Sequence, residues 1–132
     1  MDSDESFKEE EEAFTDQKNK IDHTKIFFTD LNGRVMSLSV NYHNMDKIFE
    51  NGVGFDSSSI AGYATVEQSD RILFPVPDSY HQVSFDNETV GFFIGEIRDE
   101  HGKRAKADPR AVLERVIADA EAEFGYRFIS GP

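Results

Sequence analysis

The sequence predicts one α+β domain in which a mixed sheet carries a short helix. Short segments rich in β-branched and aromatic residues recur between residues 23 and 97, as in strands. Turn-forming pairs such as Asn32-Gly33 separate them. A short helical pattern lies among these segments, and a longer amphipathic pattern follows only after residue 108.

Composition limits the classes of function. The chain has 132 residues, enough for one modest domain with a core. Its net charge of -12 argues against nucleic acid or an anionic membrane as partner. The absence of cysteine excludes disulfides, thiolate zinc sites and cysteine nucleophiles. There is no apolar run of about 20 residues and no secretory signal, which fits a cytoplasmic protein.

Residues 1–22 form an acidic segment that we expect to be a disordered tail. It contains nine Asp or Glu against three Lys, and Phe7 and Phe14 are its only large apolar residues after Met1. Such a segment buries too little surface to offset the entropy of ordering. A short helix over Phe7–Phe14, with both rings on one face, is the alternative.

The first expected structure is a hairpin. His23–Thr29 is rich in β-branched and aromatic residues, and Arg34–Val40 alternates as a half-buried strand does. Between them, Asp30 to Gly33 contains Asn-Gly, which favours a type I′ turn.

A short helix is expected next, capped by Asn44 and ended by Asn51-Gly52. Its apolar face covers the hairpin and consists of Met45, Ile48 and Phe49. The stretch Gly54–Tyr63 follows, crowded with Ser, Gly and Asp, and is expected to be a loop. Phe55 and Ile60 are the apolar residues that would hold this loop in place.

Three more strands are expected, at Asp70–Val76, His81–Phe85 and Thr89–Ile97. Pro75 indicates an edge or the end of a strand, because proline lacks the N–H that a central strand uses. Gly91 and Gly95 indicate bulges or close backbone approach in the last strand. The order of strands and helix is that of a β-grasp domain, over residues 23–107.

The strongest helix signal begins at Asp108, with Pro109 at the first helical position and Gly125 at the stop. Its apolar stripe consists of Val112, Leu113, Val116, Ile117, Ala120 and Phe124. Tyr126–Ile129 then has strand character but no partner left in the sequence. We therefore expect residues 108–132 to be the first helix and strand of a further, truncated domain.

Taken residue by residue, the sequence shows no catalytic site. Asp56 among serines and glycines is typical of a turn, and no histidine stands next to the serines to activate them. The four histidines have no metal-ligand spacing, and there is no glycine-rich phosphate loop. These residues alone indicate a β-grasp module without catalysis.

Over Lys25 to Pro132, however, the sequence resembles the N-terminal β-grasp domain of glutamine synthetases. Six residues from Phe55 to Ile60 carry the most specific part of the resemblance. The other matching segments, in order, are Glu50-Asn51-Gly52, Glu67-Gln68-Ser69-Asp70, Asp108-Pro109-Arg110 and Phe128-Ile129-Ser130-Gly131-Pro132.

The resemblance implies an ATP-dependent ligase that joins ammonia to glutamate through γ-glutamyl phosphate, with Mg²⁺ or Mn²⁺, in a homo-oligomeric ring. In this family the loop reaches the neighbouring subunit's active site. There Asp56 would be catalytic, binding ammonium and taking its proton, and Ser59 would help shape the ammonium pocket. Tyr63 and Asp70 would support the interface.

Two positions depart from the family pattern: Ser57 stands where a Gly is usual, and Thr65 where one branch has a regulatory Arg. The family's metal-binding glutamates and ATP-binding elements would follow Pro132, so we expect this chain alone to bind neither metal nor ATP and to be inactive. The alternatives are a glutamate–amine ligase of the same family and a non-catalytic β-grasp interaction module.

Overall fold

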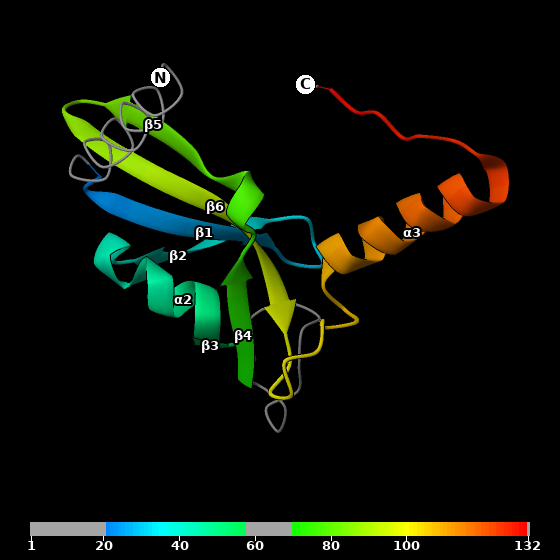
Figure 1. Ribbon diagram of the computed structural model, residues 1–132, viewed down its shortest axis with the longest axis horizontal. Coiled ribbons are helices and arrows are strands. Elements are labelled where there is room, and N and C mark those ends of the chain that lie inside the picture. Colours follow the sequence, from blue (N-terminus) through cyan, green and yellow to red (C-terminus); the bar gives the residue numbers. More distant parts are fainter. Residues whose placement is uncertain (1–20, 58–69, 132) are drawn as a thin grey trace, which may run out of the picture.

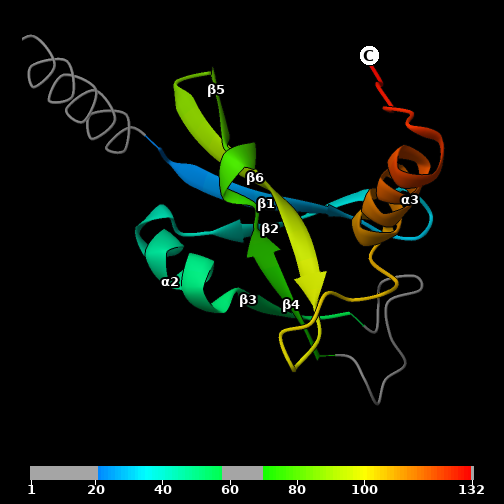
Figure 2. The same ribbon diagram turned by 45° about the vertical axis from the view of Figure 1, so that its right-hand side comes forward.

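The computed structural model describes residues 21–57 and 70–131, which form a mixed six-stranded sheet in the order β2-β1-β6-β4-β3, with β5 paired to β6. Helix α2 lies beside the sheet and α3 extends away from it (Figures 1 and 2). This arrangement confirms the α+β class. The elements are β1 His23–Thr29, β2 Val35–Val40, η1 Tyr42–Asn44, α2 Met45–Asn51, β3 Val53–Asp56, β4 Asp70–Pro75, η3 Pro77–Ser79, β5 His81–Phe85, β6 Glu88–Arg98 and α3 Pro109–Phe124.

The hairpin of β1 and β2 is confirmed, with Thr24 opposite Val40 and Thr29 opposite Val35. Its predicted type I′ turn is wrong, because in this turn only Gly33 has a positive φ, of 79°. A type I′ turn needs positive φ at both central residues, and Asp86 and Asn87 meet that condition between β5 and β6. Strand β2 is mostly exposed rather than half-buried, because it forms an edge of the sheet.

Strand β6 joins the two halves of the sheet. One edge of β6 pairs in parallel with β1. The other edge pairs antiparallel with β5 along the first half of β6 and with β4 along the second half. The close approach expected at Gly95 is confirmed: a Cβ there would lie 2.5 Å from Leu73 Cδ1 and 2.8 Å from Ile26 Cγ2. Pro75 is the last residue of β4, where its missing N–H does not interrupt the pairing.

Helix α2 buries Met45 and Ile48 against the sheet, and the Phe49 ring lies 5.4 Å from that of Phe93. The predicted apolar face is therefore confirmed, but it packs mainly against β4 and Phe93 of β6 and not mainly against the hairpin, as the sequence predicts. Asn44 occupies the cap position but makes no side-chain cap bond, whereas Asn41 caps the preceding turn by accepting from the His43 N–H at 2.9 Å. The core consists of Ile26, Phe28, Met45, Ile48, Leu73, Phe93, Ile97 and Ala105.

Helix α3 begins and ends as the sequence predicts, with Asp108 as N-cap, Pro109 in the first turn and Gly125 at φ 70°. The strand predicted from Tyr126 is wrong: residues 125–131 have no regular structure. A strand needs a neighbour for its backbone hydrogen bonds, and no described strand pairs with this segment. Most of the apolar stripe of α3 is exposed, with Leu113 at 54% and Val116 at 59%.

Candidate functional site

The predicted loop begins with a strand. Val53–Asp56 forms β3, which pairs antiparallel with β4 from Val53 opposite Leu73 to Asp56 opposite Asp70. The loop predicted from Gly54 onward is therefore wrong over Gly54 to Asp56, where glycine and aspartate, both poor strand formers, favoured a loop. Pairing with β4 and the packing of Phe55 outweigh that local preference. The alternation of Val53 and Phe55 was the signal for this strand.

Two aspartates lie directly opposite each other in the register of β3 and β4, next to residues 58–69 in the sequence. Asp56 is the last residue of β3, Asp70 is the first of β4, and both are exposed. Like charges directly opposite on neighbouring strands are destabilising, by roughly 0.2–1 kcal/mol. Two acidic side chains on the same face of a sheet place negative charge together at the surface, and this makes the pair a candidate functional site.

The residues on either side of Asp56 are anchored. The Phe55 ring packs against the core with its centroid 5.2 Å from that of Phe28, and Ser57 is completely buried. Because alternate strand residues point to opposite faces, this anchoring directs Asp56 away from the core. Among the described non-glycine residues, only Asp86 and Asn87 have positive φ, so Ser57 does not need the conformation that a glycine would favour.

The structure therefore brings together two of the four predicted site residues. Asp56 and Asp70 are paired in register, whereas Ser59 and Tyr63 lie outside the described residues, as do Ile60, Thr65 and the acidic tail to residue 20. The Arg71 guanidinium lies nearby and donates to the Asp70 carbonyl at 2.9 Å. No group of three His, Asp or Glu in residues 21–57 and 70–131 could hold a metal ion.

Asp30 and Asp99 have lowered pKa values, but each carboxylate is hydrogen-bonded within a turn. Asp30 accepts from the N–H groups of Asn32 and Arg34, at 2.9 and 2.8 Å. The Arg34 backbone N–H is the main cause that lowers the pKa of Asp30, and burial opposes it. Asp99 repeats the arrangement: the Lys103 N–H lowers its pKa most, against the effect of burial. Both carboxylates therefore have structural roles.

In the part of the chain that the structure describes, no helix is both long and apolar enough to cross a membrane.

A family model described as the beta-grasp domain of glutamine synthetase matches residues 20–100. The glutamine synthetase of Pyrococcus abyssi is 37% identical over 108 residues, covering 82% of this chain and 24% of that protein. The glutamine synthetase of Halobacterium salinarum is 33% identical over 115 residues, covering 85% of this chain and 25% of that protein. The chain thus spans about a quarter of the length of these relatives.

Solved structures have the same fold. The Plasmodium falciparum glutamine synthetase matches with a TM-score of 0.73 at 21% identity, over 85% of this chain and 22% of that one. A GmaS/ADP complex matches with a TM-score of 0.71 at 25% identity, over 84% of this chain and 25% of that one.

Proposed function

This chain belongs to the glutamine synthetase family, and from that premise we propose that it is the N-terminal part of an enzyme that joins ammonia to glutamate. ATP, with a divalent metal, would transfer its γ-phosphoryl group to the glutamate γ-carboxylate, giving ADP and the acyl phosphate γ-glutamyl phosphate. The described residues contain no cluster that fits the metal. The role proposed for this chain concerns the other substrate, ammonium.

Asp56 has the chemistry that ammonium requires. The ammonium ion has no lone pair, so a base must remove one proton before nitrogen can attack the activated carbonyl carbon. The Asp56 carboxylate would hold the cation and accept that proton. Ammonia would then form the C–N bond as phosphate leaves. The observation that best supports this role is the pairing of Asp56 with Asp70, which concentrates negative charge at one exposed point.

The exposure of Asp56 also supports a shared site. The side chain projects from the end of an edge strand, and Phe55 and Ser57 are anchored in the same chain. An exposed carboxylate at the end of an edge strand lies where a second protein surface could approach it. We propose that this surface belongs to a neighbouring subunit of a homo-oligomeric ring, with Asp70 supporting the contact and Ser59 and Tyr63 completing the pocket.

The experiment measures amide formation by the complete gene product with ATP, magnesium and glutamate, and with ammonium or a panel of larger amines. We expect glutamine from ammonium, and a loss of about 10²- to 10⁴-fold in kcat/KM for Asp56→Asn, the range for removal of a general base. Asp78→Asn is the matched control, because Asp78 is an exposed aspartate in η3 away from β3. The 132-residue chain alone should form no product.

Other outcomes would change the assignment. Activity only with larger amines would indicate a glutamate–amine ligase, in which a bulky or uncharged acceptor needs Asp56 less. No activity with any amine would indicate a non-catalytic β-grasp interaction module. Full activity of Asp56→Asn with ammonium would refute the proposed role of this residue.

A further inference from the structure

Apolar packing does little to hold α3 against the sheet. Ala111 is the buried residue of α3, and a hollow of about 360 Å³ lies between the first turns of the helix and the sheet. Phe28, Val35 and Ile94 line the sheet side of this hollow, and Pro109 and Leu113 line the helix side. Atoms that face a hollow lack the dispersion contacts that normally fix one element against another. Another interaction must set the direction of α3.

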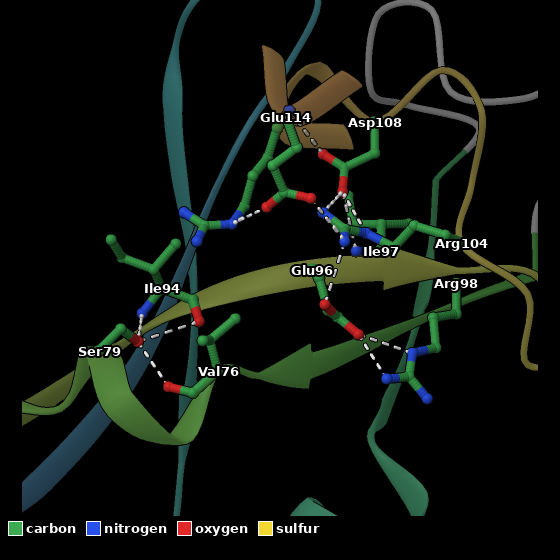
Figure 3. A network of polar contacts seen from close by, with 10 residues as sticks. Val76, Ser79, Ile94, Glu96, Ile97, Arg98, Arg104, Asp108 and Glu114 are labelled. Atoms are coloured by element: carbon green, nitrogen blue, oxygen red, sulfur yellow. Dashed lines mark hydrogen bonds and ion pairs between the residues drawn. The ribbon is translucent and has the colours of Figure 1, made fainter. Parts of the chain in front are cut away.

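A cluster of ion pairs centred on Arg104 connects β6 with the first turns of α3. Arg104, in the segment between β6 and α3, contacts Glu96 on β6 at 3.2 Å, Asp108 at 3.2 Å and Glu114 on α3 at 3.0 Å. Figure 3 shows Arg104 between the strand and the start of the helix. Only 28% of the Arg104 side chain is exposed, so solvent screens these contacts less than it would on an open surface.

The contacts attach α3 at two points. The Asp108 carboxylate accepts from the Arg110 N–H at 3.1 Å and from the Ile97 N–H of β6 at 3.2 Å, which fixes the first turn. A helix that is attached to the sheet at one point alone can still rotate about that point. Glu114 lies six residues further on, about 9 Å along the helix axis, and supplies the second point through Arg104.

We propose that Arg104 is a positioning residue that sets the angle between α3 and the β-grasp sheet. The guanidinium suits this role because its planar fork can contact carboxylates on different elements at once. Burial tends to lower its pKa, but hydrogen bonding to Glu114 and the charges of Glu96 and Asp108 outweigh this and raise it. The surrounding carboxylates therefore favour the charged form of Arg104.

The cluster also supplies a matched control. Arg98 pairs with the same Glu96, but its guanidinium lies over the Phe74 ring, 4.2 Å from the centroid, and within the described residues its side chain makes no ion pair with α3. Removal of Arg98 should weaken the cluster without releasing the helix. One consequence rests on the proposed function. Because α3 follows the domain that carries Asp56, the angle of α3 would set the position of Asp56 relative to residues that follow α3 in the enzyme.

The test measures the angle of α3 in the full 132-residue chain by pulsed electron paramagnetic resonance. The chain has no cysteine, so spin labels attach only at introduced sites, Ser39→Cys on β2 and Glu121→Cys on α3, both exposed. We expect one narrow distance distribution in the parent chain, loss of that narrow peak in Arg104→Met, and its retention in Arg98→Met. Circular dichroism checks that each variant keeps its sheet.

A distribution that stays narrow in Arg104→Met, or that broadens equally in Arg98→Met, would overturn the proposal. If Arg104→Met does not fold, Glu114→Gln removes the second attachment point on the exposed side and should broaden the distribution. The measurement needs no substrate, so its outcome is independent of whether Asp56 acts on ammonium.

Discussion

Gly95→Ala should destabilise the fold by overpacking its core. The added methyl group would lie 2.5 Å from Leu73 Cδ1 and 2.8 Å from Ile26 Cγ2, and both neighbours are fully buried. Carbon atoms pack best at about 3.5–4.0 Å, so the neighbours would have to move by about 1 Å. Overpacking of this kind costs about 1–3 kcal/mol, against about 0.4–1 kcal/mol gained by restricting the unfolded chain.

We therefore expect a net loss of about 1–2 kcal/mol in the free energy of unfolding, or a fall of about 4–8 °C in Tm for a domain of this size. Urea titration and thermal unfolding followed by circular dichroism would measure it. Gly54→Ala is the matched control, since Gly54 is also a strand residue and a Cβ there meets no atom within 4 Å. Its stability should stay the same or rise slightly.

A double variant separates overpacking from other causes. Leu73→Val removes the Cδ1 atom that the new methyl group would strike, so Gly95→Ala with Leu73→Val should be more stable than the sum of the single effects predicts. Equal stability of Gly95→Ala and Gly54→Ala, or strict additivity in the double variant, would refute the reasoning.

Two further predictions concern the stability of the fold at low pH and the self-association of the chain. The native pKa values of Asp30 and Asp99 are lowered, so their stabilisation is complete above the unfolded value, about 3.9, and is lost as the pH falls through the native values. In the double variant Asp30→Asn with Asp99→Asn, the free energy of unfolding should therefore fall less as the pH is lowered below about 4. An unchanged dependence on pH would contradict this. The exposed face of α3, with Leu113 and Val116, should make the chain self-associate in light scattering, and Val116→Glu should reduce this; a monomer at high concentration would count against it.

Local patterns in the sequence were enough to predict most of the elements. Strand β1 matches its predicted bounds, and α2, β4 and α3 differ from theirs by at most a residue or two. Their signals are periodicity, capping residues and proline, which act within a few residues of one another. The sequence also singled out Asp56 and Asp70, through a family resemblance, although it did not show that they are opposite each other.

Interactions between distant residues decided the rest. Strand β3 and the pairing of Asp56 with Asp70 depend on β4, because a weak strand former becomes a strand when a neighbour takes its hydrogen bonds. The same reason explains why Tyr126–Ile129, with strong strand character but no described partner, stays irregular. The direction of α3 follows from Arg104 meeting carboxylates from β6, the helix cap and the helix, a convergence that exists only once the chain has folded.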